Sequence, residues 1–353
     1  MYSLNIDEKY SIVISLDFKN LGSYFKNEKI NKKIVITDDN VSKYYLKDII
    51  NIIGEKNTLI YQIKSGEKSK NIEEVCKIYD IMINNNIDRK SVIISLGGGV
   101  VGDIAGFVAS TYMRGIKIIQ IPTTLLAQVD SSIGGKTGID FLNKKNIIGT
   151  FYNPYLVYTN IKTLKTLPKE QFSNGMAEVI KYGYILDKDY LDFIFNNREK
   201  IKNYDKNTIL NMIIKSCEIK ASIVSIDEKE KGIREILNFG HSFGHSIETT
   251  SGFKILHGQA VAIGMIASMY ISYLKGYIEK EVIEQAKYIL KYFGIYNKNI
   301  LNVDSIYKNM IYDKKNENKK IRLIILEEIG KAFSTDDINE KMIKDAIKYA
   351  LEG

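Results

Sequence analysis

All three histidines of this 353-residue chain, His241, His245 and His257, lie in the stretch "LNFGHSFGHSIETTSGFKILHG". His241 and His245 are four residues apart, so on a helix they share one face. Neutral imidazoles are good zinc ligands, and the gathering of every histidine among glycines favours a metal site over a chance cluster. The spacing alone nominates His241 and His245 as the ligand pair, but it does not settle which two histidines bind the ion.

The remaining ligand must be a carboxylate or water. The only cysteines, Cys76 and Cys217, are far apart and outside any CxxC motif, which excludes a thiolate zinc site. The segment "SNGMAEVIKYG" offers Glu178, with Lys181 one helical turn further on. A carboxylate on a face otherwise made of Met, Val and Ile needs a partner if it is buried, so Glu178 is the candidate ligand.

A second candidate site is the glycine-rich stretch "SVIISLGGGVVGDIAGFVAS", which predicts a strand, a tight turn and the start of a helix. Gly97, Gly99 and Gly102 fit G-x-G-x-x-G, in which the backbone approaches a pyrophosphate and the helix N-terminus offers free N–H groups. The alternative is a tight turn that binds nothing. The turn follows the third predicted strand, not the first, and no acidic residue ends a strand about 20 residues later, as the usual fingerprint requires.

Other strand ends supply groups that such a dinucleotide needs. Asp38 and Glu67 follow the two preceding predicted strands and are candidates for binding a ribose, and Thr123 and Thr124 follow the next strand. Because open parallel sheets bind ligands at the carboxyl ends of their strands, we expect these residues to line one crevice.

The elements that position these residues follow from hydrophobic periodicity. Short β-branched runs at 33–37, 58–63, 91–96, 116–121 and 155–160 predict strands, and amphipathic stretches such as 70–86 predict helices between them. This alternation indicates an α/β domain with a Rossmann-like parallel sheet. From Ser173 onwards the pattern is helical, with long segments at 206–227 and 258–276. We expect an α/β domain at 1–166 and an all-helical domain at 167–353.

Composition excludes several classes of protein. The net charge of +8 is spread along the chain without a basic block, which argues against a nucleic-acid partner and is compatible with an anionic small substrate. No apolar run reaches membrane-spanning length, and the N-terminus lacks the features of a signal peptide. With two isolated cysteines, these features predict a cytoplasmic protein without a membrane partner.

With these residues in view, the chain resembles the 3-dehydroquinate synthases. The motifs that carry the resemblance occur in the expected order: "GGGVVGDIAGFVASTYMRGI", "IPTTLLAQVDSSIGGKTGID", "GMAEVIKYG", "LNFGHSFGHSIE", "HGQAVAIGM" and "DKKN". The resemblance implies the two-domain fold of the glycerol-dehydrogenase group, a homodimer, NAD, and a divalent cation, zinc or cobalt, between the domains.

The resemblance also assigns roles to individual residues. It implies Glu178, His241 and His257 as metal ligands, which overrules the spacing preference for His245 and turns that residue toward substrate. Together with Asp38, which was nominated by its place after a strand, the expected cofactor contacts are the following: Ser65, Gly66, Glu67, Lys68, Ser69, Lys70, Gly99, Val100, Val101, Gly102, Asp103, Thr123, Thr124, Lys136, Lys145, Thr163, Leu164, Lys165 and Thr166. The resemblance implies the following catalytic or substrate contacts: Arg114, Asp130, Lys136, Asn146, Lys181, Lys220, Arg234, Asn238 and His245. Arg114 would reach the substrate phosphate from a neighbouring subunit, and one of Lys314 and Lys315 is also expected at the site.

The implied activity is that of a phosphorus–oxygen lyase of the shikimate pathway, which supplies chorismate and the aromatic amino acids. 3-Deoxy-D-arabino-heptulosonate 7-phosphate would be oxidised transiently by NAD, lose phosphate, regain the hydride and close to 3-dehydroquinate by an aldol addition. The alternatives are another sugar phosphate cyclase, of the inosose or valiolone type, and a metal-dependent polyol dehydrogenase. One departure from the family is Gln259 in place of the usual glutamate. Its loss of charge is expected to loosen the orientation of His257 or to alter its basicity, without abolishing metal binding.

Overall fold

The computed structural model describes residues 1–6, 9–26, 29–142, 144–315 and 321–352, and it divides the chain into two compact units. The first unit comprises Met1–Pro168 and Ile209–Ser225, and the second comprises Lys169–Thr208 and Ile226–Gly353. The sequence prediction placed one boundary near Thr166. The units divide close to that point, at Pro168, and most of helix α8 (Lys206–Ile226) packs in addition with the first unit.

The first unit is built on a seven-stranded sheet in the order β1-β2-β9-β6-β5-β3-β4. The strands are β1 (Tyr2–Ile6), β2 (Tyr10–Ser15), β3 (Lys33–Asp38), β4 (Thr58–Ile63), β5 (Val92–Gly97), β6 (Lys117–Pro122) and β9 (Leu156–Asn160). All neighbouring pairs are parallel except β1 with β2. The predicted alternation is therefore confirmed, but the glycine turn follows the fifth strand in chain order, because the N-terminal hairpin was not predicted.

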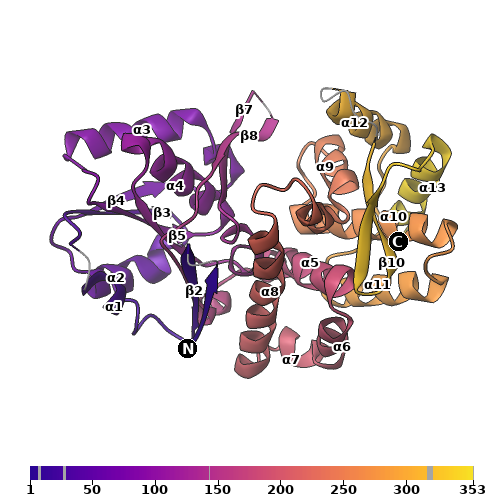
Figure 1. The fold of residues 1–353 in the computed structure, drawn as a ribbon, viewed down its shortest axis with the longest axis horizontal. Coiled ribbons are helices and arrows are strands. Elements are labelled where there is room, and N and C mark those ends of the chain that lie inside the picture. Colours follow the sequence, from indigo (N-terminus) through magenta and orange to yellow (C-terminus); the bar gives the residue numbers. More distant parts are fainter. Residues whose placement is uncertain (7–8, 27–28, 143, 316–320, 353) are drawn as a thin grey trace. The chain divides into compact units, whose positions relative to one another are not determined.

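Helices cover both faces of this sheet, as the continuous apolar strands require. Helices α3 (Ile72–Asn84) and α4 (Gly99–Thr111) pack on one face, and α1 (Ser23–Lys26) and α2 (Ser42–Ile53) pack on the other (Figure 1). A separate hairpin of β7 (Lys136–Phe141) and β8 (Lys144–Phe151) contacts α4. The chain passes from β3 out to β4 and returns to β5 on the other side of β3, so the strand order switches between β3 and β5.

The second unit consists mainly of helices: α5 (Lys169–Leu186), α6 (Lys188–Asn196), α7 (Arg198–Lys202), α9 (His241–Thr250), α10 (His257–Leu274), α11 (Lys280–Tyr292), α12 (Val303–Lys315) and α13 (Glu340–Leu351). Helix α10 is apolar on nearly all sides and lies at the centre, against α5, α9 and α13. The expectation of an all-helical domain was wrong in one respect. Strands β10 (Leu323–Glu328) and β11 (Lys331–Thr335) form an antiparallel hairpin that packs on α10.

Glycines allow the central helices to approach closely enough to bring their functional residues together. A Cβ on Gly258 would lie 2.2 Å from the backbone oxygen of Asn174 on α5. A Cβ on Gly264 would lie 2.0 Å from the backbone oxygen of Gly240, at the start of α9. Neither distance is possible for a real side chain, so both helix contacts depend on glycine.

Candidate metal centre and nucleotide-binding turn

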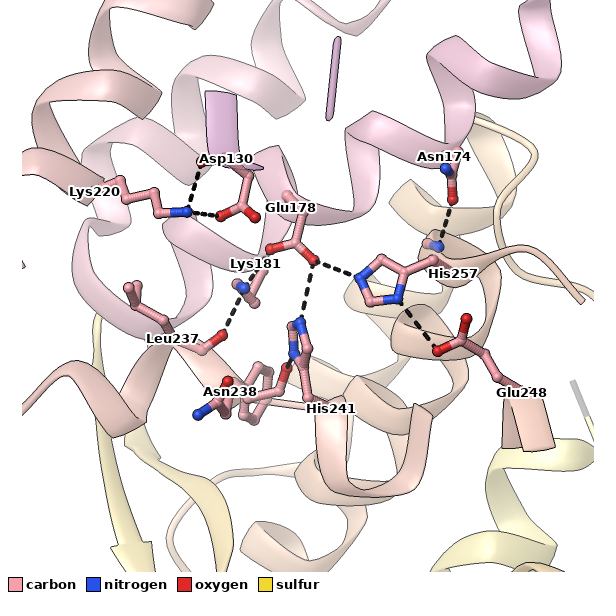
Figure 2. Close-up of polar contacts among 12 residues, drawn as sticks. Asp130, Asn174, Glu178, Lys181, Lys220, Leu237, Asn238, His241, Glu248 and His257 are labelled. Carbon is pink, nitrogen blue, oxygen red and sulfur yellow. Dashed lines mark hydrogen bonds and ion pairs between the residues drawn. The ribbon is translucent and has the colours of Figure 1, made fainter. Parts of the chain in front are cut away.

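The second unit brings one carboxylate and two imidazoles from three helices to a single point (Figure 2). Glu178 lies in the middle of α5, His241 is the first residue of α9 and His257 is the first residue of α10. Their donor atoms all lie within 4.8 Å of one another. Glu178 Oε1 is 3.7 Å from His241 Nε2 and 3.8 Å from His257 Nε2.

These distances are too long for hydrogen bonds and close to the ligand–ligand spacing, roughly 3.3–3.5 Å, of a tetrahedral site with bonds of about 2.1 Å. Glu178 is fully buried, and within the described residues neither of its oxygens accepts a hydrogen bond. It contacts the buried ammonium of Lys181 as an ion pair. A fully buried carboxylate with so few partners, facing two imidazole nitrogens, fits a divalent cation.

The protonation state of His241 also suits metal binding. Burial, together with the charges of Lys181 and the neighbouring histidines, lowers the pKa of His241 well below its ordinary value of 6.5. Its Nδ1 lies 3.2 Å from the backbone oxygen of Phe239, a distance at which an Nδ1–H donates to that carbonyl. The neutral ring then presents the lone pair of Nε2 toward Glu178.

His245 lies on the same helix but at a different position in the cluster. It is exposed, and its ring centre lies 5.5 Å from that of His241 and 6.2 Å from that of His257. A second set of three donors, from His245, Glu248 and His257, is also compact enough for an ion. The carboxylate of that set, Glu248, was missed by the sequence analysis, although its spacing of i, i+4 and i+7 with His241 and His245 places it on the same helix face.

Of the residues expected to contact substrate within the second unit, Arg234 and Asn238 belong to a short 3₁₀ segment, Ile233–Asn238, and Lys181 contacts it. Lys181 Nζ donates to the backbone oxygen of Leu237 at 2.6 Å (Figure 2). The buried guanidinium of Arg234 donates to the backbone oxygen of Glu228, and Asn238 donates to Glu230. Neither acidic residue was identified from the sequence.

In the first unit, the predicted nucleotide-binding residues meet at the carboxyl ends of the strands. Gly98 caps α4 without a side-chain hydrogen bond, which leaves the first N–H groups of the helix for a ligand. The Thr123 hydroxyl, at the end of β6, is buried and has no hydrogen-bond partner among the described residues. Asp38, at the end of β3, uses one oxygen to accept from the backbone N–H groups of Asn40 and Val41. These features fit a phosphate and ribose at the strand switch point.

The glycines of the turn have different neighbours. A Cβ on Gly97 would lie 2.5 Å from the side chain of Val101, and one on Gly102 would lie 3.0 Å from Gln120 Oε1. Gly97 is therefore needed for packing between helix and sheet, whereas a side chain at Gly102 would require the glutamine to shift slightly. A Cβ on Gly99 would meet only the side chain of Ser131, at 3.2 Å, so this position is the one best suited to approach by a ligand.

A buried lysine joins several of the expected cofactor residues. Lys70 Nζ lies 2.6 Å from Asp103 and 3.8 Å from Glu67, and it also donates to Asn146. Burial opposes the charge of Lys70, but Asp103 and Glu67 raise its pKa above the ordinary value. Burial also raises the pKa of Asp103, against the effect of Lys70, so the ammonium is what favours an ionised carboxylate. Asp140, which accepts from the N–H of Asn146, was not identified from the sequence.

The remaining expected residues of the first unit occupy varied positions. Lys220, on α8, donates to the backbone oxygen and to Oδ1 of Asp130 at 2.7 and 2.6 Å. Thr163 and Leu164 are buried, and the Thr163 hydroxyl already donates to a backbone oxygen. The exposed ones are Arg114, Lys136, Lys145, Lys165 and Thr166, with Ser65, Gly66 and Lys68 in the loop after β4. The Ser69 hydroxyl donates to a backbone oxygen of that loop. Val100 is half-buried and Val101 is buried. The Thr124 hydroxyl accepts a hydrogen bond from the backbone N–H of Ala127. The side chains of Lys314 and Lys315 lie outside the described residues.

Two family models match consecutive parts of the chain. The model for the N-terminal part of 3-dehydroquinate synthase matches residues 60–174, and the model for the C-terminal part matches residues 175–316. A 3-dehydroquinate synthase from Ruminiclostridium cellulolyticum is 42% identical over 351 residues, which cover 98% of each chain. The chain belongs to the 3-dehydroquinate synthase family.

Similar solved structures confirm the fold. A 2-deoxy-scyllo-inosose synthase, described as complexed with carbaglucose-6-phosphate, NAD+ and Co2+, has a TM-score of 0.90 and 25% identity over 99% of both chains. A 2-epi-5-epi-valiolone synthase from Streptomyces hygroscopicus has a TM-score of 0.89 and 23% identity, covering 100% of this chain and 99% of the other. Among the residues that the structure describes, we find no helix that is both long and apolar enough to cross a membrane.

Proposed function

We propose that the protein converts 3-deoxy-D-arabino-heptulosonate 7-phosphate to 3-dehydroquinate and phosphate, with NAD and one divalent cation, zinc or cobalt. The observation that carries this proposal is the identity of 42% to a 3-dehydroquinate synthase over 98% of both chains. The inosose and valiolone synthases share the fold at much lower identity. The cluster of Glu178, His241 and His257 supports the cation, and the open N-terminus of α4 supports the dinucleotide.

We assign the roles of the side chains from their chemistry. When bound, the cation supplies positive charge beside a substrate hydroxyl, and NAD supplies a reversible acceptor for hydride from the carbon that carries this hydroxyl. Glu178, His241 and His257 hold the cation. Lys181, buried and positively charged, stabilises negative charge that develops on a substrate oxygen, and the exposed His245 exchanges protons with the substrate.

The proposed substrate carries two anionic groups, and several side chains suit them. Lys136, Lys220, Arg234 and Asn238 are proposed to receive the carboxylate, because lysine and arginine bind anions and an amide donates hydrogen bonds. Asp130 accepts a hydrogen bond from Lys220 and keeps that cation in place, and Asn146 does the same for Lys70 among the cofactor residues. The phosphate is assigned to Arg114.

We further propose that the protein acts as a homodimer in the cytoplasm. Arg114 lies at a surface that exposes Met113, and the nearby β7–β8 hairpin exposes Phe141, Ile147 and Phe151. Such a group of apolar side chains favours contact with another chain. Sedimentation of the wild type and of an Ile147→Asp variant tests this. The wild type is expected to be a dimer, and the variant is expected to dimerise more weakly. A wild type that stays monomeric at micromolar concentration would contradict the proposal.

Phosphate release tests the reaction. The purified protein, with trace NAD and zinc, is incubated separately with the heptulosonate phosphate, sedoheptulose 7-phosphate and glucose 6-phosphate. Phosphate is expected from the first alone, without accumulation of NADH absorbance, and a chelator is expected to stop it. Release from sedoheptulose 7-phosphate or glucose 6-phosphate alone would identify a different cyclase, and steady growth of NADH would identify a dehydrogenase.

A variant tests the metal assignment separately. His257→Ala is expected to lose both bound metal and activity while it keeps the circular dichroism of the wild type, since His257 lies at a helix start with part of its ring exposed. Unchanged metal content in this variant would refute the ligand set. His245→Ala is the matched control for metal content, because it removes a neighbouring imidazole that is not assigned to the ion.

A further inference from the structure

The imidazole of His257 lies between two carboxylates. Its Nε2 faces Glu178 at 3.8 Å, and its Nδ1 lies 3.4 Å from Oε2 of Glu248 on α9 (Figure 2). The side chain of Glu248 is only 4% exposed, whereas that of His257 is 29% exposed. A carboxylate buried to this extent, within hydrogen-bond distance of the outer nitrogen of a candidate ligand, is suited to accept the N–H of that ring.

A histidine that binds a metal through one nitrogen needs the other nitrogen to be held. The group that accepts its N–H fixes the tautomer and the orientation of the ring, and a carboxylate there also makes the ring a stronger ligand. We propose that Glu248 is a positioning residue, which accepts a hydrogen bond from Nδ1–H of His257 and directs its Nε2 to the cation held by Glu178 and His241. This inference rests on the proposed function, since it assumes that the cation binds there.

The two candidate histidine ligands differ in how the ring is held. His241 is more buried than His257, and its Nδ1 faces a backbone oxygen that the fold keeps in place. His257 is the first residue of its helix and more accessible to water. A side-chain carboxylate is therefore the means by which this ring is oriented, and we expect metal affinity to depend on it.

Position 259 has a contact of its own. Gln259 stands where the family usually has glutamate, and an effect of this change on His257 stays a prediction. In the structure Gln259 caps α10, and its Oε1 accepts from the backbone N–H of Leu256 at 3.3 Å. An amide oxygen serves this purpose as a carboxylate would. Glu248 contacts the Nδ1 of His257 at 3.4 Å.

Glu248 has one alternative role, as a ligand in the set with His245 and His257. The geometry favours Glu178 as the carboxylate ligand. It is fully buried, accepts no hydrogen bond within the described residues and faces the imidazoles of His241 and His257. The exposed His245 would have to complete the alternative set. The two roles predict different effects of substitution, because an amide still accepts a hydrogen bond but is a poor zinc ligand.

The test measures metal affinity without turnover. Zn²⁺ binding to the metal-free full chain is followed by competition with a coloured chelator, and the ligand set is followed by the visible spectrum of bound Co²⁺. Glu248→Leu is expected to weaken Zn²⁺ binding by about 10- to 100-fold with the Co²⁺ spectrum and one ion per chain retained. Glu248→Gln is expected to fall between Glu248→Leu and the wild type.

Controls separate the possible outcomes. Gln259→Ala removes a cap near the same ring and is expected to change Zn²⁺ affinity by less than about 3-fold, while Glu178→Gln is expected to abolish tight binding. Equal Zn²⁺ affinity of the wild type and Glu248→Leu would overturn the inference. It would also be overturned if Glu248→Gln lost the ion as completely as Glu178→Gln does. A wild type that binds no Zn²⁺ would instead refute the proposed function. If Glu248→Leu fails to fold, the Zn²⁺ affinity of Glu248→Gln tests the inference by itself, since a value below that of the wild type is expected.

Discussion

Replacing Lys181 with methionine is expected to destabilise the metal-free protein strongly and the zinc-bound protein only weakly. Lys181 is 2% exposed and forms an ion pair with Glu178, which is 0% exposed. Removing one member of a buried pair typically costs about 3–5 kcal/mol, because the other charge is left in a medium that solvates it poorly. A divalent cation at Glu178 would compensate that carboxylate in place of the ammonium.

The size of the effect follows from the contacts. In the metal-free protein, stranding Glu178 and losing the 2.6 Å hydrogen bond to Leu237 together predict a loss of about 4 kcal/mol. With zinc bound, only the hydrogen bond and some packing are lost, about 1 kcal/mol. With a urea slope of about 3 kcal/mol per M, the midpoint should fall by about 1.3 M without metal and by about 0.3 M with it.

The assay is urea unfolding followed by circular dichroism, with chelator and with saturating zinc. The Glu178→Gln/Lys181→Met double variant completes the cycle, and without metal it is expected to be more stable than Lys181→Met because no unpaired charge remains. Equal losses of stability with and without zinc would refute the reasoning, since they would mean that the ammonium and the cation do not neutralise the same carboxylate.

Three other predictions follow from local contacts. Gly99→Ala should weaken NAD binding, measured by fluorescence titration, with little loss of stability. Gly97→Ala should instead lower the melting temperature, because its Cβ would meet a side chain at 2.5 Å. Equal NAD affinity of Gly99→Ala and the wild type would argue against the turn as a phosphate site. Gly258→Ala should reduce both stability and metal affinity, since its Cβ would lie 2.2 Å from a backbone oxygen of α5, and a metal affinity like that of the wild type would contradict this. Burial raises the pKa of the Cys217 thiol to about 12, so at pH 8 a thiol reagent should label only the exposed Cys76 until the protein is unfolded; two fast thiols in the native protein would show that Cys217 is accessible.

The sequence by itself determined the parts of this protein that depend on local pattern. The five predicted strands agree with β3, β4, β5, β6 and β9 to within one residue at each end, because short β-branched runs between turn residues have few other ways to fold. The glycine turn and the histidine cluster were also visible as spacing. The β10–β11 hairpin was missed although the run before Gly330 carries a strand signal, since the helical pattern around it dominated the prediction.

Only the tertiary structure decided which of these residues meet. Spacing favoured His241 with His245, but the carboxylate that faces His241 belongs to α5 and the second imidazole that faces it begins α10. Close helix contacts at glycines bring these residues together, and such contacts join positions far apart in the chain. For the same reason the sequence could not show that α8 packs with the first unit through Lys220 and Asp130, or that Glu248 contacts His257.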